Sequence, residues 1–577
     1  MKTRRCPQPS SPTSYKYDEL PKDGTFRFLT LLPGVGDAPL ECNLHTAKLA
    51  GSQFEAISYV WGTKIRDQKI LCDGQTVLVT PNLAWVLRRV RLPNKPRTLW
   101  ADSICIHQDD PEEKGHQVAL FGDIYRAAQR VLVCLGPDDK NHGPIACSLM
   151  DDVVTILDKT FKRIKMSHDS FRWPNKNDPL LTDQRWKSFR ALFECDWFKR
   201  SWVVQEVAFA RDSRVLWGES TFIWDKVMRT CIWLLCRATI LCHGEKFFHT
   251  HEGVWDSLGL PSILETLECA RNLQLEDQRD RIYAFTKLPQ APRQYTKPWP
   301  DYHSSYLDTY RQFAIEYVLA RRSTEILDYV CHDDEVLAEI PSWVPLWNVP
   351  SCSLGSSLGL RKMSLRTLSI YEPRLTKDGS LRVRGVIFDT VYYASDLCII
   401  ASGVACPYAA ENDWSTRLQA FLESLSYGQH RGDYSEWKNA RESFVMTAQL
   451  ERIALEDRPQ RQTAAETADE TNHYYSAIKD YLVSQRFILT ERGYMGLAPA
   501  VAHKGSLRGI IFGCQTPCVL ERTDREQYYK FLGATTLMGK ERSMTLGGDE
   551  TFINTLGVED SKDWVEWNMK EQDIYLC

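Results

Sequence analysis

The sequence predicts an α/β fold in which a parallel sheet domain occupies the N-terminal half and helical and α+β regions follow. Short β-branched and aromatic runs alternate with amphipathic helical segments through residues 25–245, as is typical of parallel strand–helix–strand units. At 577 residues the chain exceeds the ~250 to 300 residues that one hydrophobic core supports. We therefore expect at least two domains.

The first predicted elements lie between residues 54 and 91. Residues 54–61 are aromatic and β-branched and end at Gly62, which indicates a buried strand meeting a turn. Asn82 can cap a helix over residues 83–91, where apolar side chains recur at helical spacing.

Strands and helices continue to alternate after this helix. Buried strands are predicted over residues 99–106 and 131–135, and Asp110, followed by a proline and two glutamates, predicts the start of a helix between them. Residues 201–210 predict a short helix and 214–217 a fourth strand. In such folds, ligands bind at the carboxyl ends of the strands.

Composition shifts along the chain predict its domain boundaries. Residues 1–24 are expected to form a flexible arm, 25–245 the α/β domain, and 246–350 a mainly helical extension. Residues 351–577 predict a C-terminal α+β domain, with a charged disordered loop near 456–472.

Charge and hydropathy exclude several functional classes. Lys and Arg number 71 and Asp and Glu 75, giving a net charge of −4 without a basic stripe, which argues against a nucleic-acid partner. The N-terminus lacks the apolar run of a signal peptide, and charges interrupt the longest apolar stretches, so we expect no membrane span and a cytoplasmic location. The 18 cysteines are scattered, many of them within apolar runs, and are expected to be reduced.

Three sequence blocks resemble a known family. They read Phe54-Glu-Ala-Ile-Ser-Tyr-Val-Trp-Gly62, Trp100-Ala-Asp-Ser-Ile-Cys-Ile-His-Gln108 and Trp197-Phe-Lys-Arg-Ser-Trp-Val-Val-Gln-Glu206. These blocks resemble the signature of the fungal heterokaryon-incompatibility (HET) domain, and residues 117–136 fit the same family in order and spacing. His107 departs from the family, which usually has Asn there.

Segments beyond the domain also resemble parts of full-length HET proteins. They are Asp280-Arg-Ile-Tyr283, Pro341-Ser-Trp-Val-Pro345 and Arg492-Gly-Tyr-Met-Gly-Leu497. The resemblance implies a fungal protein of non-self recognition and regulated cell death.

HET domains are in turn similar to Toll/interleukin-1 receptor (TIR) domains, which have a flavodoxin-like fold. Some TIR domains hydrolyse NAD with a helix glutamate in a Trp-x-x-x-Glu block, which Trp202 and Glu206 match here. The resemblance thus implies Glu206 as a catalytic residue, Trp202 as a nucleotide contact and NAD as a substrate, with no cofactor or metal required.

The chemistry of NAD cleavage suits a single carboxylate. Breaking the nicotinamide–ribose bond passes through an oxocarbenium-like ribose, which a carboxylate stabilises, and nicotinamide leaves as a neutral molecule. Residues four apart share a helix face, so Trp202 and Glu206 can line one site. Alternatively, Trp202 is a core anchor and Glu206 a salt-bridged helix residue.

Four residues lie where the first predicted strand ends. Ser58, Tyr59, Trp61 and Gly62 offer a nucleotide a hydroxyl, two rings and an open backbone. A Trp-Gly turn packed on the core explains the same residues.

The second predicted strand carries acid-base groups near its end. Asp102, His107 and Asp109 lie there together with Cys105, but alternation disfavours a nucleophilic pair of Cys105 and His107.

The sequence favours neither a metal site nor a dinucleotide fingerprint. Cys231, Cys236, Cys242 and His243 lack the paired Cys-x-x-Cys spacing of zinc sites and are interpreted as buried groups of an apolar helix. The glycines form no Gly-x-Gly-x-x-Gly or Walker pattern, which argues against an oxidoreductase or NTPase.

Three functional hypotheses follow. The first is a TIR-like enzyme that consumes NAD when assembled. The second is an interaction module that self-associates through its HET domain and signals to an unknown partner protein without chemistry. The third is an accessory protein of a fungal metabolic pathway.

Overall fold

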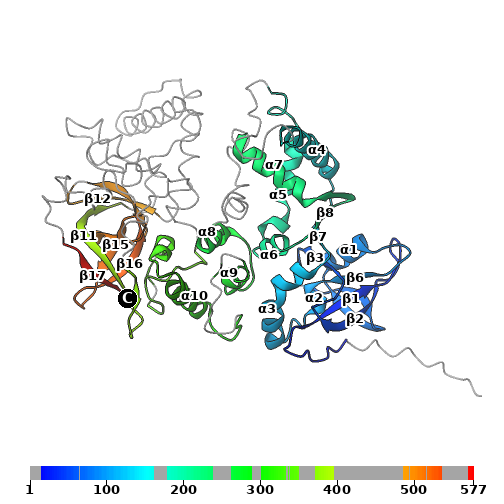
Figure 1. Cartoon of the computed structure of the whole chain (residues 1–577), viewed down its shortest axis with the longest axis horizontal. Helices are drawn as coiled ribbons and strands as arrows, with labels where there is room; N and C mark the ends of the chain where they lie inside the picture. Colours follow the sequence, from blue (N-terminus) through cyan, green and yellow to red (C-terminus); the bar gives the residue numbers. More distant parts are fainter. Residues whose placement is uncertain are drawn as a thin grey trace, which may run out of the picture. The chain divides into compact units, whose positions relative to one another are not determined.

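The computed structural model divides into two compact units (Figure 1). It describes residues 15–63, 65–161, 178–237, 262–288, 291, 300–332, 335–336, 338–349, 371–395, 485–492, 494–514, 516–535 and 570–577. The first unit contains the described residues up to 237 together with those of 273–291 and 300–303. The second contains 262–272 and the described residues from 304 onward. The predicted disordered loop near 456–472 lies outside the described residues.

A nine-stranded sheet, in the order β5-β4-β2-β1-β6-β3-β7-β8-β9, forms the centre of the first unit. Its strands are β1 (Thr25–Leu31), β2 (Glu41–Lys48), β3 (Glu55–Tyr59), β4 (Gln68–Cys72), β5 (Gln75–Val79), β6 (Arg97–Trp100), β7 (Arg130–Gly136), β8 (Ser213–Trp217) and β9 (Ser220–Ile223). Strand β7 buries five consecutive residues, as strands covered on both faces do.

The sheet is mixed, so the prediction of a parallel sheet holds for its middle and for the pair of β2 and β4, but not for the whole sheet. Strands β6, β3, β7 and β8 are parallel neighbours. Antiparallel pairings of β1 with β6 and of β8 with β9 flank this block. Strands β1 and β2, and β8 and β9, also form antiparallel hairpins, which need no crossover helix. The four parallel strands follow the spatial order second, first, third, fourth along the chain.

The helices of the first unit separate these strands. They are α1 (Pro81–Val90), α2 (Asp102–Cys105), α3 (Pro111–Ala127), α4 (His142–Phe161), α5 (Trp186–Glu194), the 3₁₀ turn η2 (Asp196–Lys199), α6 (Val203–Ala208), α7 (Trp224–Arg237) and α9 (Asp280–Tyr283). The predicted cap of α3 is confirmed, because the Asp110 side chain accepts hydrogen bonds from the backbone amides of Glu112 and Glu113.

Two local predictions were wrong. Thr80, not Asn82, caps α1, and the Asn82 amide instead donates to the Val60 carbonyl. The second predicted strand ends at Trp100, and one helical turn, α2, follows. Asp102 is the first residue of this turn and its side chain accepts from the Ser103 amide, while the apolar residues after it are buried inside the turn.

The second unit combines short helices with a β-barrel. Its helical elements are α8 (Ile263–Cys269), η4 (Ala270–Asn272), α10 (Tyr306–Arg321) and η5 (Glu325–Tyr329). Its strands are β10 (Arg374–Leu375), β11 (Leu381–Ala394), β12 (Gln485–Thr490), β13 (Met495–Pro499), β14 (Leu507–Ile511), β15 (Cys518–Arg522), β16 (Tyr528–Ala534) and β17 (Gln572–Leu576). Strands β11, β14, β15, β16 and β17 form a closed ring, because β17 pairs with both β16 and β11.

Membrane and disulfide predictions can be compared with the described residues. Among them, no helix has the length and apolar character to cross a membrane. Eleven described cysteines form no disulfide, as predicted, but Cys331 is disulfide-bonded, against that prediction.

Candidate functional site

The candidate site lies where β3 and β6 end, at the carboxyl edge of the parallel strands. Strand β3 supplies Ser58 and Tyr59, which are 1% and 2% exposed, and Trp61 follows it. The Trp61 indole donates a 2.9 Å hydrogen bond to Asp102, which starts α2 two residues after the end of β6. Polar groups from the ends of two neighbouring parallel strands thus lie in contact at this edge.

Glu206 lies on α6 and turns its carboxylate toward β3. Its side chain is only 2% exposed, and Oε2 accepts a hydrogen bond from the Ser58 hydroxyl. The Ser58 oxygen in turn accepts a 2.7 Å hydrogen bond from the indole nitrogen of Trp197. This chain of donors fixes the Ser58 hydroxyl so that its proton points to the carboxylate.

Arg200 supplies the positive charge of the site. Its Nη1 donates a 2.5 Å hydrogen bond to the Tyr59 carbonyl and lies 3.9 Å from Glu206 Oε1. The Arg200 guanidinium therefore links the end of β3 to Glu206, the catalytic candidate.

Asp102 adds a second carboxylate. It accepts from the Trp61 indole and the Ser103 amide, and the Ser103 hydroxyl lies 2.6 Å from the Tyr59 hydroxyl. Burial raises the pKa of Asp102, against the opposing influence of Arg200 and of the Trp61 hydrogen bond.

The protonation of Glu206 is set by its surroundings. Burial raises its pKa to about 7, and the nearby negative charge of Asp102 acts in the same direction. Arg200 and the Ser58 hydrogen bond act to lower it. Glu206 thus changes charge near neutral pH, where a carboxyl can act either as an anion or as an acid.

Trp202 makes contacts of its own. Its indole nitrogen donates a 3.2 Å hydrogen bond to Asp280 Oδ2, and its ring lies 4.9 Å from the ring of Phe121. The residues predicted to contact a nucleotide therefore have different neighbours in the structure. Ser58 touches Glu206, whereas the indole of Trp202 bonds to a segment outside the three sequence blocks.

Gly62 follows the site with a positive φ of 74°. A side chain there would collide with Asn82, because a Cβ atom would lie 2.6 Å from the Asn82 amide nitrogen. The positive φ favours glycine at this turn, and any other residue would also require the Asn82 side chain to move.

The remaining sequence candidates lie away from Glu206 in the contacts that the structure describes, or outside the described residues. Cys105 is fully buried, and burial raises its thiol pKa to about 12, so it is a poor nucleophile. The His107 ring stacks on Tyr17 at a centroid distance of 4.8 Å, and Asp109 is exposed. Cys231 is partly buried, while Cys242 and His243 lie outside the described residues, as does the side chain of Cys236.

One group of possible metal ligands occurs among the described residues. Ligand atoms of His107, Asp110 and Glu113 lie within 4.8 Å of one another. Both carboxylate oxygens of Glu113 already bind Arg27, at 2.5 and 2.9 Å, in a nearly buried ion pair. The Arg27 guanidinium therefore already neutralises the Glu113 carboxylate that a metal cation would need as a ligand.

Sequence reasoning missed three members of the site. Arg200 and Trp197 lie inside a recognised block, but no spacing rule marks Arg200 as a neighbour of Glu206 or Trp197 as a donor to Ser58. Asp280 lies in a segment that was noted only for its resemblance, and its contact with Trp202 joins positions 78 residues apart.

Comparison with known proteins gives the class. Residues 54–206 match the family model for Heterokaryon incompatibility protein (HET), and these residues contain β3, β6 and the part of α6 that ends at Glu206. Residues 407–540 match the Het-6 beta-barrel domain, although β11 and β17, which close the observed barrel, lie outside that match. The chain therefore carries a HET domain, followed by a segment that matches the Het-6 beta-barrel domain.

A curated relative sharpens the comparison. The chain is similar to Heterokaryon incompatibility protein 6, OR allele, of Neurospora crassa, with 31% identity over 211 residues. The match covers 30% of this chain and 30% of the relative, so the chain spans less than a third of that protein. No solved structure matches the chain.

Proposed function

We propose that this protein takes part in fungal non-self recognition and regulated cell death, and that its HET domain does so by TIR-like hydrolysis of NAD. The name of its Neurospora crassa relative and the HET match support the first part. The observation that carries the second is Glu206, a carboxyl with a pKa of about 7 at the carboxyl ends of parallel strands. The order of the four parallel strands, which flavodoxin-like sheets share, supports the TIR-like fold.

The proposed reaction converts NAD and water into ADP-ribose, nicotinamide and a proton. The bond between ribose C1′ and the nicotinamide nitrogen breaks, and its electron pair leaves with the neutral nicotinamide. The Glu206 carboxylate stabilises the positive charge that develops on the ribose. A water oxygen then bonds to C1′ and releases its proton, which the carboxylate can accept.

In the described geometry, neighbouring side chains cover the Glu206 carboxyl. Glu206 is 2% exposed, and the Ser58 hydroxyl occupies one of its oxygens. Contact with a nucleotide requires the surrounding side chains to open, so the proposed enzyme has low activity as an isolated chain and gains activity when chains assemble. In this proposal Tyr59 and Trp61 line the nucleotide site, and NAD is a substrate rather than a resident cofactor.

Buried Glu206 also favours a second candidate function. A carboxyl that is fully enclosed by Ser58 and Arg200 is suited to hold α6 on the sheet of an interaction module without chemistry. In that case the domain signals through self-association or through a partner protein.

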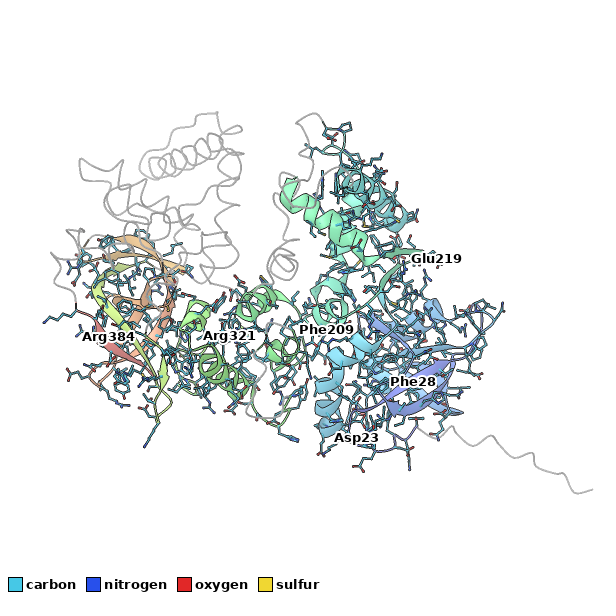
Figure 2. All side chains as sticks on the ribbon, viewed as in Figure 1. Asp23, Phe28, Phe209, Glu219, Arg321 and Arg384 are labelled. Atoms are coloured by element: carbon cyan, nitrogen blue, oxygen red, sulfur yellow. The ribbon has the colours of Figure 1, made fainter. Side chains whose placement is uncertain are left out.

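Expression in a filamentous fungus separates the two functions. The enzyme predicts that the full chain lowers cellular NAD and viability, and that Glu206→Gln, which keeps the side-chain shape, abolishes both effects. Viability loss that persists in a folded Glu206→Gln variant supports the interaction module instead. Glu219→Gln, at the exposed residue labelled in Figure 2, is the matched control.

A further inference from the structure

A segment that follows the matched HET residues in the sequence packs against α6, the helix that carries Glu206, and against the residues just before this helix. We name the described residues 273–288 and 300–303, which belong to the first unit, the clasp. The HET match ends at residue 206, so the family model does not include the clasp.

The clasp first binds the chain just before α6. Gln274 forms an isolated parallel bridge with Arg200. Its amide donates a 2.5 Å hydrogen bond to the Lys199 carbonyl, and its carbonyl accepts a 3.1 Å hydrogen bond from the Ser201 amide. The backbone on either side of Arg200 is thus held by one residue of the clasp.

The clasp next binds α6 and its N-terminal residue. Asp280 accepts from the Trp202 indole at 3.2 Å, and the Tyr283 carbonyl accepts from the Gln205 side chain at 3.3 Å. Gln205 is the neighbour of Glu206 and is 1% exposed. These contacts fix the two ends of the turn that leads from Trp202 to Glu206.

Asp280 is the centre of the clasp. Its carboxylate is 7% exposed, and its Oδ1 accepts a 2.6 Å hydrogen bond from the Tyr302 hydroxyl. Tyr302 in turn lies under two cations, with Lys114 Nζ 4.8 Å and Arg279 Cζ 5.1 Å from the ring centroid. The Asp280 side chain therefore joins α6 to both parts of the clasp.

Small residues of α3 permit the close approach of the clasp. A Cβ atom on Gly115 would lie 3.3 Å from the Pro300 carbonyl oxygen, and one on Gly122 would lie 3.1 Å from Lys287 Cβ. Gly122 also faces Phe209, labelled in Figure 2, which ends α6. Lys287 adds an ion pair with Asp123 at 3.5 Å.

We propose that the clasp positions Arg200 and Glu206 within the HET domain, and that Asp280 is the positioning residue, which acts through Trp202. Both ends of the clasp continue into residues of the second unit. The geometric part of this inference is independent of NAD chemistry, and only its kinetic consequence rests on the proposed function.

Two indole groups report on the two ends of this connection. The Trp202 N–H bonds to Asp280, and the Trp197 N–H bonds to Ser58 beside Glu206. In the full-length chain labelled with ¹⁵N-tryptophan, each indole resonance is assigned by its absence from a Trp202→Phe or Trp197→Phe variant. Asp280→Ala is expected to shift both resonances, and Asp280→Asn, which keeps an acceptor, to restore most of the Trp197 position.

Asp389→Ala in the barrel is the matched control. Asp389 is equally buried, at 7% exposure, but belongs to the second unit and accepts from Thr390. The control is expected to leave both indole resonances in place. Should Asp280→Ala not fold, Tyr302→Phe is the alternative, because it removes only the hydroxyl that donates to Asp280. This variant is expected to shift both resonances, by smaller amounts than full loss of the Asp280 carboxylate would.

The outcomes separate this inference from the proposed function. A Trp202 shift without a Trp197 shift, or equal shifts in Asp389→Ala, overturns the inference. If the wild-type chain releases nicotinamide, Asp280→Ala is expected to lower kcat about 10- to 100-fold with little change in KM, because a misplaced carboxylate loses transition-state stabilisation. If the wild type releases none, the proposed function fails while the two resonances still decide the positioning role.

Discussion

The indole nitrogen of Trp197 lies 2.7 Å from the hydroxyl oxygen of Ser58, and this hydroxyl donates to Glu206. Two residues 139 positions apart thus orient a proton toward the carboxyl on which the proposed function depends. The Ser58 hydroxyl is therefore a direct probe of the site.

Replacing Ser58 with Ala is expected to destabilise the protein. The variant leaves the Trp197 N–H and one Glu206 oxygen without a partner in a buried site, and such losses cost about 1.5 to 3 kcal/mol. Urea unfolding measures the change. Ser52→Ala removes a hydroxyl that donates to the Lys48 carbonyl at an exposed position and is expected to cost less. Equal losses in the two variants contradict the role given to Ser58.

Glu206 is expected to make stability depend on pH. Its pKa is raised from 4.5 to about 7 in the folded protein, so the folded state binds the proton more tightly than the unfolded state. Stability therefore falls as pH rises from about 4.5 to about 7, by an amount on the order of 3 kcal/mol. Glu206→Gln removes this contribution.

The comparison of wild type with Glu206→Gln isolates one group. Burial also raises the pKa of Asp102, and that of Asp280 to about 6, with the same sign, but both residues are present in each protein. The stability of Glu206→Gln relative to wild type should increase between pH 5 and pH 8 in chemical unfolding. A difference that stays constant over this range contradicts the raised pKa.

Removing the charge of Arg200 is expected to move the titration of Glu206 upward. Arg200 lowers the pKa of this carboxyl, so Arg200→Met should raise the pH at which Glu206 ionises. The midpoint is measured from the pH-dependent stability difference between Arg200→Met and its double variant with Glu206→Gln. An unchanged midpoint would show that the 3.9 Å separation carries little coupling.

Removing the charge of Asp102 should have the opposite effect. Asp102 raises the pKa of Glu206, so Asp102→Asn is expected to lower the same midpoint while its side-chain oxygen still accepts from the Trp61 indole. A midpoint shift in the same direction as that of Arg200→Met would point to loosened packing instead of charge.

The regular part of the first unit could be predicted from sequence because its signals are local. The strands near residues 55, 131 and 214 are buried runs, and α3 has its cap and proline in adjacent positions. The end of the second strand was mispredicted because Ile104, Cys105 and Ile106 are all buried, and a buried helical turn has no alternation that separates it from a strand.

The long-range contacts could not be predicted in this way. The barrel closes through the register of Leu381 with Leu576, and the clasp joins Gln274 to Arg200 by a single bridge. Neither contact leaves a periodic signal, because each depends on how distant segments pack. Glu206 itself was identified by resemblance, whereas its pKa and its partners Ser58 and Arg200 required the structure.

Nicotinamide release by the purified full-length chain tests the central claim most directly. Wild type, Glu206→Gln and the exposed control Glu219→Gln are incubated with NAD, dilute and under crowding that promotes assembly. The account predicts that wild type and Glu219→Gln release nicotinamide and ADP-ribose in equal amounts, more on assembly, and that Glu206→Gln releases neither. Intact NAD in all samples, or equal release by Glu206→Gln, would contradict it.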